Sequence, residues 1–319
     1  MRYQNPVFAD YFADPFVWRV GDEYFAVGTG REESEGVDET AGWVFPLLHS
    51  RDLVHWKRVG EALERPDSSL GDTCWAPEVA AQNGNHWLYY SIGFGDKRHQ
   101  IRAAVADGPT GPYRDAEVNP LVAPTDPPFA IDPHPFRDDD GQWYLFYARD
   151  FLDVGGGLRA GTAIVVDRLE RMDRVVGEPC VVVRARNDWQ RFLANRPMYG
   201  GVYDWHTLEG PCVVKHDGRY YCFYSGGRWE NESYGVDYAV ADHVLGPYSD
   251  AGSEAGPRVL KTVPGKVLGP GHNSVVTGPD GEQYLAYHAW DAAMTGRRLC
   301  IDRLLWTPDG PRCVATCLP

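Results

Sequence analysis

The sequence predicts an all-β protein, specifically a five-bladed β-propeller with four-stranded antiparallel blades. Five times along the 319 residues, a strand-like run passes through a glycine-centred turn into an aromatic-rich strand. Such turns between β-rich segments indicate hairpins, because glycine and asparagine accept positive φ angles. The turn glycines recur 57 to 77 residues apart, a period that suits four-stranded blades with loop insertions. They are Gly21, Gly84, Gly141, Gly218 and Gly281.

Each repeat is expected to supply the inner hairpin of one blade. Aromatic residues make up 13% of the chain and glycines number 35, a composition that favours many short strands joined by tight turns. The predicted hairpins span residues 13–28, 75–93, 131–148, 209–226 and 271–288.

Outer strands are expected between these hairpins. The final run, residues 297–311, either completes the last blade or pairs with N-terminal residues to close the ring, because closure removes exposed strand edges. A propeller accommodates the whole chain, residues 1–319, as one domain, because each blade packs only on its neighbours. The outer strands of blades one to four are predicted at 48–60, 101–113, 162–173 and 238–248.

Charge and hydropathy exclude several classes of partner. The formal charge of -14 argues against nucleic acid and anionic membranes, so a neutral ligand is expected. The sequence contains no run of about 18 apolar residues, so no transmembrane helix is predicted. No secretory signal is visible at the N-terminus, and the seven cysteines lack zinc-site spacing, so we expect reduced thiols in a cytoplasmic protein.

Three carboxylates occupy similar positions in three of the repeats. Asp132 and Glu209 each precede their turn glycine by nine residues, and Asp14 precedes Gly21 by seven. If five blades turn about one axis by roughly 72° each, equivalent positions converge on one face. The three acids are therefore predicted to share one pocket.

This arrangement matches the chemistry of inverting glycoside hydrolysis, which needs a protonated acid beside the leaving oxygen and a second carboxylate that activates water. We assign Asp14 as the general base and Glu209 as the general acid. Asp132 is assigned a tuning and orienting role, because a like charge nearby raises a carboxyl pKa. Taken singly, Asp14 and Asp132 are also explained as turn residues before proline that begin a strand, and Glu209-Gly210-Pro211 as a surface turn.

The motifs that carry these acids resemble glycoside hydrolase family 43 in order and in extent. The resemblance implies a five-bladed propeller that acts on arabinofuranosides and xylosides with inversion, with base, modulator and acid at Asp14, Asp132 and Glu209. It also implies that His272 faces the central channel, near a hydrated Ca²⁺ ion. Because Ca²⁺ prefers six to eight oxygen ligands, water would have to complete such a site. The motifs are Ala13-Asp14-Pro15, Cys74-Trp75-Ala76-Pro77-Glu78, Ile131-Asp132-Pro133, Glu209-Gly210-Pro211 and Gly271-His272-Asn273-Ser274.

Five further residues are candidates for substrate binding. Trp75 is expected to be a sugar platform or a core wedge between blades, because indoles pack on the C–H faces of sugars. Glu78 is expected to bond to sugar or to pair with an arginine. Strand alternation allows only one of two neighbouring arginines at 297 and 298 to reach the pocket, and Arg298 is preferred. Trp205 and His206 end an aromatic stretch before Glu209 and are predicted to line the pocket.

The leading functional hypothesis is an exo-acting glycosidase that releases α-L-arabinofuranosyl units from small oligosaccharides or arabinosides. A β-D-xylosidase and an endo-1,5-α-L-arabinanase are the alternatives within the same family. A noncatalytic glycan-binding propeller and a propeller glycosidase acting on fructosides are alternatives of other kinds. No cofactor is expected to be required, a structural Ca²⁺ stays open, and the sequence does not indicate an oligomeric state.

Overall fold

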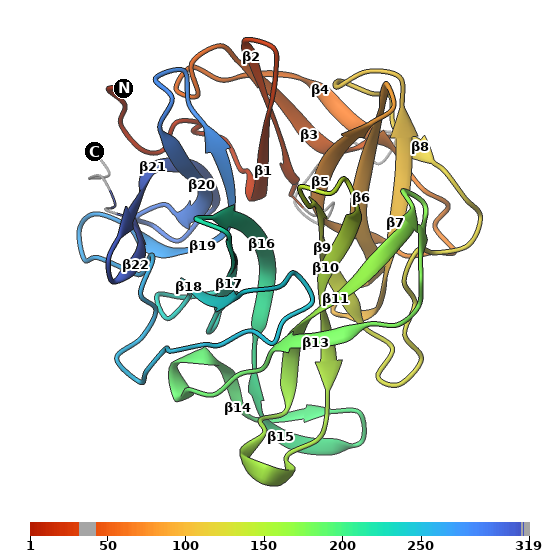
Figure 1. Cartoon of the computed structure of the whole chain (residues 1–319), viewed down its shortest axis with the longest axis vertical. Helices are drawn as coiled ribbons and strands as arrows, with labels where there is room; N and C mark the ends of the chain where they lie inside the picture. The colour runs from red at the N-terminus through yellow and green to blue at the C-terminus, as the bar shows by residue number, and fades with distance from the viewer. Residues whose placement is uncertain (32–42, 314, 316–319) are drawn as a thin grey trace.

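The computed structural model describes residues 1–31, 43–313 and 315, and its described strands form five sheets (Figure 1). The architecture is all-β and propeller-like, as predicted. Two short 3-10 helices, Gly155–Gly157 and Asp188–Gln190, interrupt the described strands. Among the described residues, no helix has the length and apolar character needed to cross a membrane.

Two sheets near the N-terminus have four antiparallel strands each. The first contains β1 (Ala13–Val20), β2 (Glu23–Thr29), β3 (Trp43–Ser50) and β4 (Lys57–Glu64). The second contains β5 (Thr73–Gln82), β6 (Asn85–Phe94), β7 (Lys97–Ala106) and β8 (Arg114–Asp115).

The third and fourth sheets depart from the expected four strands, with seven and three strands in the described residues. The third holds β9 (Ala130–Arg137), β10 (Trp143–Phe151), β11 (Gly161–Arg171), β12 (Arg174–Val175), β13 (Cys180–Val183), β14 (Arg191–Met198) and β15 (Gly201–His206). The fourth holds β16 (Leu208–His216), β17 (Arg219–Gly226) and β18 (Gly235–Ala241). Two of the three extra strands of the third sheet arise because the long aromatic stretch before Glu209 folds into the β14–β15 hairpin, which joins β11 through one parallel pair. The third arises because β12 and β13 both pair with β11.

The fifth sheet has four strands and receives the N-terminal segment. The backbone N–H of Val7 donates to Leu299 O at 2.9 Å, and Phe12 N–H donates to Arg297 O at 2.9 Å. Both roles considered for residues 297–311 are therefore realised together, because this run completes the last sheet and also pairs with the N-terminus. The strands are β19 (Leu268–Thr277), β20 (Gln283–Trp290), β21 (Arg297–Thr307) and β22 (Gly310–Cys313).

The sheets pack side by side in a closed order, with one apolar cluster between each neighbouring pair. Tyr89 enters the cluster shared with the third sheet, whereas Tyr90 enters the cluster shared with the first, as alternation along a strand requires. The first strands also contact one another in the sequence β1, β5, β9, β16, β19 and back to β1 (Figure 1). These contacts bring the N-terminal ends of the five first strands to one place.

A β-bulge lies near the start of every first strand. At each bulge one residue has a positive φ, a conformation that residues other than glycine seldom adopt. The five residues are Asp14 (49°), Ala76 (48°), Asp132 (59°), Gly210 (56°) and His272 (50°). Asp14 and Asp132 are thus structurally equivalent, whereas Glu209 precedes the equivalent position by one residue, which corrects the predicted equivalence of Asp132 and Glu209.

Each bulge also links its sheet to the preceding sheet. The amide of the positive-φ residue, which the bulge removes from the strand ladder, is paired with a side chain from the neighbouring sheet. The contacts are Ala76 N to Thr29 Oγ1 (2.9 Å), Asp132 N to Ser91 Oγ (3.0 Å), Gly210 N to Asp132 Oδ2 (2.9 Å), His272 N to Ser225 Oγ (2.7 Å) and Asp14 N to His288 Nδ1 (3.1 Å).

Candidate active site

A cavity of about 110 Å³ lies where the first strands begin, and it contains all three predicted acids. In a regular strand, consecutive side chains point to opposite faces, but the bulges turn neighbours such as Ile131 and Asp132 into the same cavity. Sequence alternation alone could not have placed both there. The described lining residues are Asp14, Trp75, Ile131, Asp132, Glu209, Trp229, His272 and Arg297.

Asp14 is held as a carboxylate. Its Oδ1 lies 3.2 Å from Arg297 Nη1 and 3.4 Å from His272 Nδ1. Burial alone would raise the pKa of this carboxyl, but Arg297, His272 and His288 outweigh burial and hold the pKa well below its usual value. An ionised carboxylate at neutral pH can accept a proton from water.

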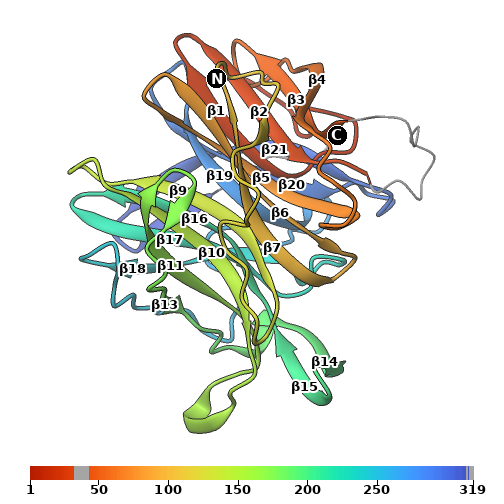
Figure 2. The ribbon, with the colours of Figure 1, turned by 90° about the vertical axis from the view of Figure 1, so that its right-hand side faces the viewer.

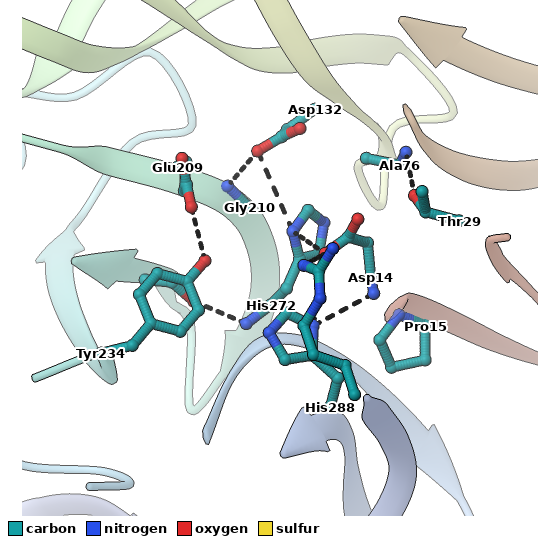
Figure 3. A network of polar contacts seen from close by, with 12 residues as sticks. Asp14, Pro15, Thr29, Ala76, Asp132, Glu209, Gly210, Tyr234, His272 and His288 are labelled. Atoms are coloured by element: carbon teal, nitrogen blue, oxygen red, sulfur yellow. Dashed lines mark hydrogen bonds and ion pairs between the residues drawn. The ribbon is translucent and has the colours of Figure 1, made fainter. Parts of the chain in front are cut away.

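His288 contacts both the backbone amide and the carboxylate of Asp14 (Figure 3). Its Nδ1 lies 3.1 Å from the Asp14 backbone nitrogen and 3.2 Å from Asp14 Oδ1. A neutral imidazole with its proton on Nε2 accepts from the amide, and one with its proton on Nδ1 donates to the carboxylate. Burial lowers the pKa of His288 to about 4, so the imidazole is neutral in either arrangement.

Glu209 is held in the opposite state. Burial raises its pKa to about 7, and the charge of Asp14 adds to this effect. The hydroxyl of Tyr234 donates to Glu209 Oε1 at 2.7 Å, which acts in the other direction by stabilising the anion (Figure 3). A carboxyl group that keeps its proton up to about pH 7 can act as a general acid.

Tyr234 reaches Glu209 because the neighbouring strand makes room for its ring. The ring is parallel to the imidazole of His288, with centroids 5.7 Å apart and an interplanar angle of 3°. A side chain at Gly271 would overlap with this ring, so the glycine of the Gly271-His272 motif is required by the close approach. The sequence analysis missed Tyr234, which lies in a polar connection between β17 and β18 that has no strand periodicity.

Asp132 lies beside the acid. Its Oδ2 accepts the Gly210 N–H at 2.9 Å, so it is tied to the residue that follows Glu209 (Figure 3). Burial, followed by the charges of Glu209 and Asp14, raises the pKa of Asp132 well above its ordinary value. Both carboxyls in this half of the cavity therefore have raised pKa values, which favours their protonated forms.

His272 lines the cavity, as predicted, and its Nδ1 faces Asp14 Oδ1 at 3.4 Å and Asp132 Oδ2 at 3.9 Å. Burial lowers its pKa, which makes the neutral imidazole the favoured form. Within residues 1–31, 43–313 and 315, no group of three or more His, Cys, Asp or Glu side chains is arranged to hold a metal ion. These side chains do not by themselves make the oxygen-rich cage that Ca²⁺ prefers.

Two tryptophans, from different sheets, line the cavity. Trp75 lines the cavity and stacks on His99, with ring centroids 3.9 Å apart. Trp229 was missed by the sequence analysis. It is parallel to Trp290, and the Arg297 guanidinium lies 4.6 Å from its ring centroid. Each indole therefore has a parallel aromatic neighbour that helps to hold its ring in place.

The structure places Arg297, not Arg298, in this cavity. Strand alternation was correct in admitting only one of the two, but the pairing of β21 with β20 puts Arg297 opposite Trp290 and turns it toward Asp14. Arg298 points to the other face and pairs with Asp291 at 2.8 Å.

Glu78 was predicted to contact a sugar or an arginine, but it pairs with a histidine instead. Its Oε2 accepts a hydrogen bond from His134 Nδ1 at 2.8 Å, and His134 Nε2 accepts the Val213 N–H at 2.9 Å. Because Nε2 is an acceptor here, the imidazole proton is on Nδ1. This buried chain links three sheets and does not line the cavity.

Trp205 and His206 also lie away from the cavity, contrary to prediction. They end β15, whose hairpin with β14 lies at one end of the molecule (Figures 1 and 2). His206 Nε2 accepts from Arg159 Nη1 at 2.9 Å, and the guanidinium of Arg196 lies 5.7 Å from the Trp205 ring centroid. The aromatic stretch therefore packs on itself and does not line the described part of the cavity.

Comparison with known proteins places this geometry in a family. The family model described as glycosyl hydrolases family 43 matches residues 3–311. A solved structure of a thermostable family-43 glycoside hydrolase superposes with a TM-score of 0.83 at 29% identity, covering 100% of this chain and 98% of the other.

Curated relatives carry several names. A beta-D-galactofuranosidase from Aspergillus niger is 30% identical over 322 residues, which cover 96% of this chain and 83% of the relative. An extracellular endo-alpha-(1->5)-L-arabinanase from Bacillus subtilis is 26% identical, covering 93% and 86%. An extracellular exo-alpha-(1->5)-L-arabinofuranosidase from Cellvibrio japonicus is 27% identical, covering 93% and 84%.

Proposed function

The chain belongs to glycosyl hydrolases family 43 and is a glycosidase, and from that premise we propose that it is an exo-acting, inverting α-L-arabinofuranosidase. Its substrates would be arabino-oligosaccharides and arabinosides. The observation that supports this most is one small cavity in which Asp14 has a lowered pKa and Glu209 a raised one. We interpret the five sheets as the five blades of one closed propeller.

In the proposed reaction, Asp14 and Glu209 act on opposite sides of one sugar. A water molecule attacks the anomeric carbon and gives its proton to the Asp14 carboxylate as the glycosidic C–O bond breaks. The proton of Glu209 passes to the leaving oxygen, so the acid becomes a carboxylate while the base becomes protonated. Inverting enzymes of this kind hold the two carboxyls about 6.5–9.5 Å apart to leave room for the water.

The remaining cavity residues orient these two. Arg297 keeps Asp14 ionised and positioned, and Tyr234 fixes the carboxyl of Glu209. Asp132 orients the Gly210 amide next to the acid and keeps the local charge low by holding a proton. Trp75 and Trp229 would pack on the faces of the bound sugar.

The size of the cavity supports exo action. The cavity that contains both acids is small, about 110 Å³, and we take it to bind a single sugar ring. A β-D-galactofuranosyl unit is a second candidate, favoured by the 30% identical relative from Aspergillus niger. Its ring has the same configuration as that of α-L-arabinofuranose, and the two differ in the carbon chain outside the ring.

The test is a panel of p-nitrophenyl glycosides together with linear arabino-oligosaccharides. We expect hydrolysis of the α-L-arabinofuranoside, at least 100-fold slower hydrolysis of the β-D-xyloside, and arabinose as the first product released from the oligosaccharides. A preference for the xyloside would favour the β-xylosidase alternative. Release of arabinobiose or longer products first would favour an endo-arabinanase, and binding without turnover would favour a noncatalytic propeller.

A further inference from the structure

A second and larger cavity, of about 580 Å³, adjoins the first. The two share Trp75, which is a lining residue of both. Tyr11 forms a second connection, because it lines the larger cavity while its hydroxyl accepts a hydrogen bond from Arg297 at 2.8 Å. A group bound in the larger cavity would therefore lie next to the sugar bound in the smaller one.

The larger cavity lies on the side of Asp14 and away from Glu209. Its described lining comes from the N-terminal segment, the first and second sheets and Arg298 of the fifth. In the ring of first strands, β16 is adjacent to neither β1 nor β5. Because the leaving group must sit beside the acid, this cavity is on the wrong side to receive it. What can enter is a part of the sugar that extends away from the cleaved bond.

The chemistry of the lining suits hydroxyl groups. Arg58 and Glu61 form an ion pair within the lining, and Arg298, held by Asp291 at 2.8 Å, contributes a further guanidinium. Hydroxyls donate to carboxylates and accept from guanidinium groups, so such pairs match adjacent hydroxyls. The aromatic ring of Tyr11 gives the same cavity an apolar surface for C–H groups.

We propose that this second cavity binds the exocyclic diol chain of a β-D-galactofuranosyl-type substrate, so that the enzyme accepts hexofuranosides in addition to pentofuranosides. The inference rests on the proposed function, because it takes the furanose ring to occupy the cavity between Asp14 and Glu209. An α-L-arabinofuranoside and a β-D-galactofuranoside have the same ring configuration and differ by one exocyclic CHOH group. Their comparison therefore isolates the contribution of the second cavity.

The experiment measures kcat/KM for the p-nitrophenyl derivatives of these two sugars. For the unmodified chain we expect the two values to lie within tenfold of each other. In Arg298→Met, the ratio of galactofuranoside to arabinofuranoside kcat/KM should fall about tenfold, the size expected for about 1.4 kcal/mol of lost hydrogen bonding. The matched control is Arg303→Met on the same strand, where Arg303 pairs with Glu282 outside both cavities, and its ratio should not change.

A second variant protects the test against loss of folding in the first. Val44→Phe adds bulk to the lining of the second cavity only, and the same ratio should fall. Hydrolysis of the arabinofuranoside but not of the galactofuranoside would overturn the inference and leave the proposed function intact. The inference would also be overturned by unchanged ratios in both variants, or by release of arabinobiose, which would place a second sugar ring in this cavity. Hydrolysis of the galactofuranoside alone would also overturn the inference, which requires both sugars to be accepted, and would replace arabinose in the proposed function.

Discussion

At the scale of single residues, two buried carboxyls in one cavity are held in opposite states by different neighbours. Asp14 is surrounded by Arg297 and two imidazoles, so its pKa stays well below the usual value despite burial. Glu209 receives one hydrogen bond from Tyr234 and keeps a pKa of about 7 because burial dominates. The pH dependence of catalysis should follow from these two groups. Activity should fall as pH rises through about 7, where the acid loses its proton, and should persist to low pH, where Asp14 remains ionised.

Glu209→Gln removes the proton that the leaving group needs. We expect kcat/KM for an unactivated arabinoside to fall about 10²–10⁴-fold, the usual contribution of a general acid. A 2,4-dinitrophenyl arabinoside should be affected far less, because its leaving group needs little protonation, and the decline above neutral pH should disappear. Equal losses on both substrates would show that Glu209 is not the acid.

Tyr234→Phe tests whether the hydroxyl tunes the acid. Because the hydrogen bond stabilises the Glu209 anion, its loss should raise the pKa of Glu209 and move the alkaline limb of kcat/KM upward by about 1 pH unit. The matched control is Tyr287→Phe, where the lost hydroxyl donates to Asp302 in the fifth sheet. That variant should be less stable than the wild type, but the alkaline limb of its kcat/KM profile should not move. A limb that stays in place in Tyr234→Phe would reduce this tyrosine to a packing role.

At the scale of elements, the bulge at the start of each first strand is the device that builds the site. In the third sheet it turns two successive side chains, Ile131 and Asp132, into the cavity. In every sheet the amide of its positive-φ residue is tied to the preceding sheet. Positive φ at aspartate, alanine and histidine is strained, and the surrounding sheets hold it in place. Most of the side chains that line the cavity therefore come from residues at or next to these five backbone irregularities.

Gly271→Ala tests the fit between neighbouring elements. Its side chain would overlap with the ring of Tyr234 and push the hydroxyl away from Glu209. We expect an upward shift of the alkaline limb, as in Tyr234→Phe, together with a loss of stability of about 1–3 kcal/mol from overpacking. Gly108→Ala is the control, because a side chain there would meet open space. An unshifted limb with normal stability would mean that the ring can move aside without consequence.

The sequence was enough to predict the inner hairpins and the sharing of one cavity by three acids. It was not enough to predict which residues occupy equivalent positions in the repeats. Counting back from the turn glycine fails because Gly21 is the first residue of a two-residue turn, whereas Gly218 is the second. The turn containing Gly141 is longer still, since Arg137 pairs with Trp143. Strand register is set by hydrogen bonds across the pair, so turn length hides the equivalence of Asp14 and Asp132.

Other residues of the site could not be predicted from repeat position or strand alternation. Tyr234 and Trp229 come from a connection in which no period distinguishes an inward from an outward side chain. Alternation allows one of Arg297 and Arg298 to point inward but leaves the choice to the register of β21 on β20. The aromatic residues of the stretch that contains Trp205 correctly indicated an ordered segment. Trp205 nevertheless packs within its own hairpin, because composition does not show which surface an aromatic side chain covers.

At the scale of the whole molecule, the N-terminal segment fastens the first and last sheets together. Asn5 Nδ2 donates to Ile301 O at 2.8 Å, and its Oδ1 accepts from Ile301 N–H at 2.9 Å, so one side chain replaces a backbone pair. Asn5→Ala leaves these buried groups unpaired and should lower the free energy of unfolding by about 1–3 kcal/mol. Denaturant unfolding gives the loss, and kcat/KM at 25 °C should be unchanged. A wild-type midpoint would show that this fastening does not contribute to closure.

The closed arrangement of sheets brings Asp14 and Glu209 into one cavity, and the proposed mechanism requires them to act on opposite sides of a single bound sugar. The measurement that tests this most directly is proton NMR of the first sugar released from an α-L-arabinofuranoside, recorded before mutarotation. The account predicts the β-anomer, formed by attack of water from the side of Asp14. Release of the α-anomer would contradict it, because retention requires a carboxylate close enough to bond to the sugar itself.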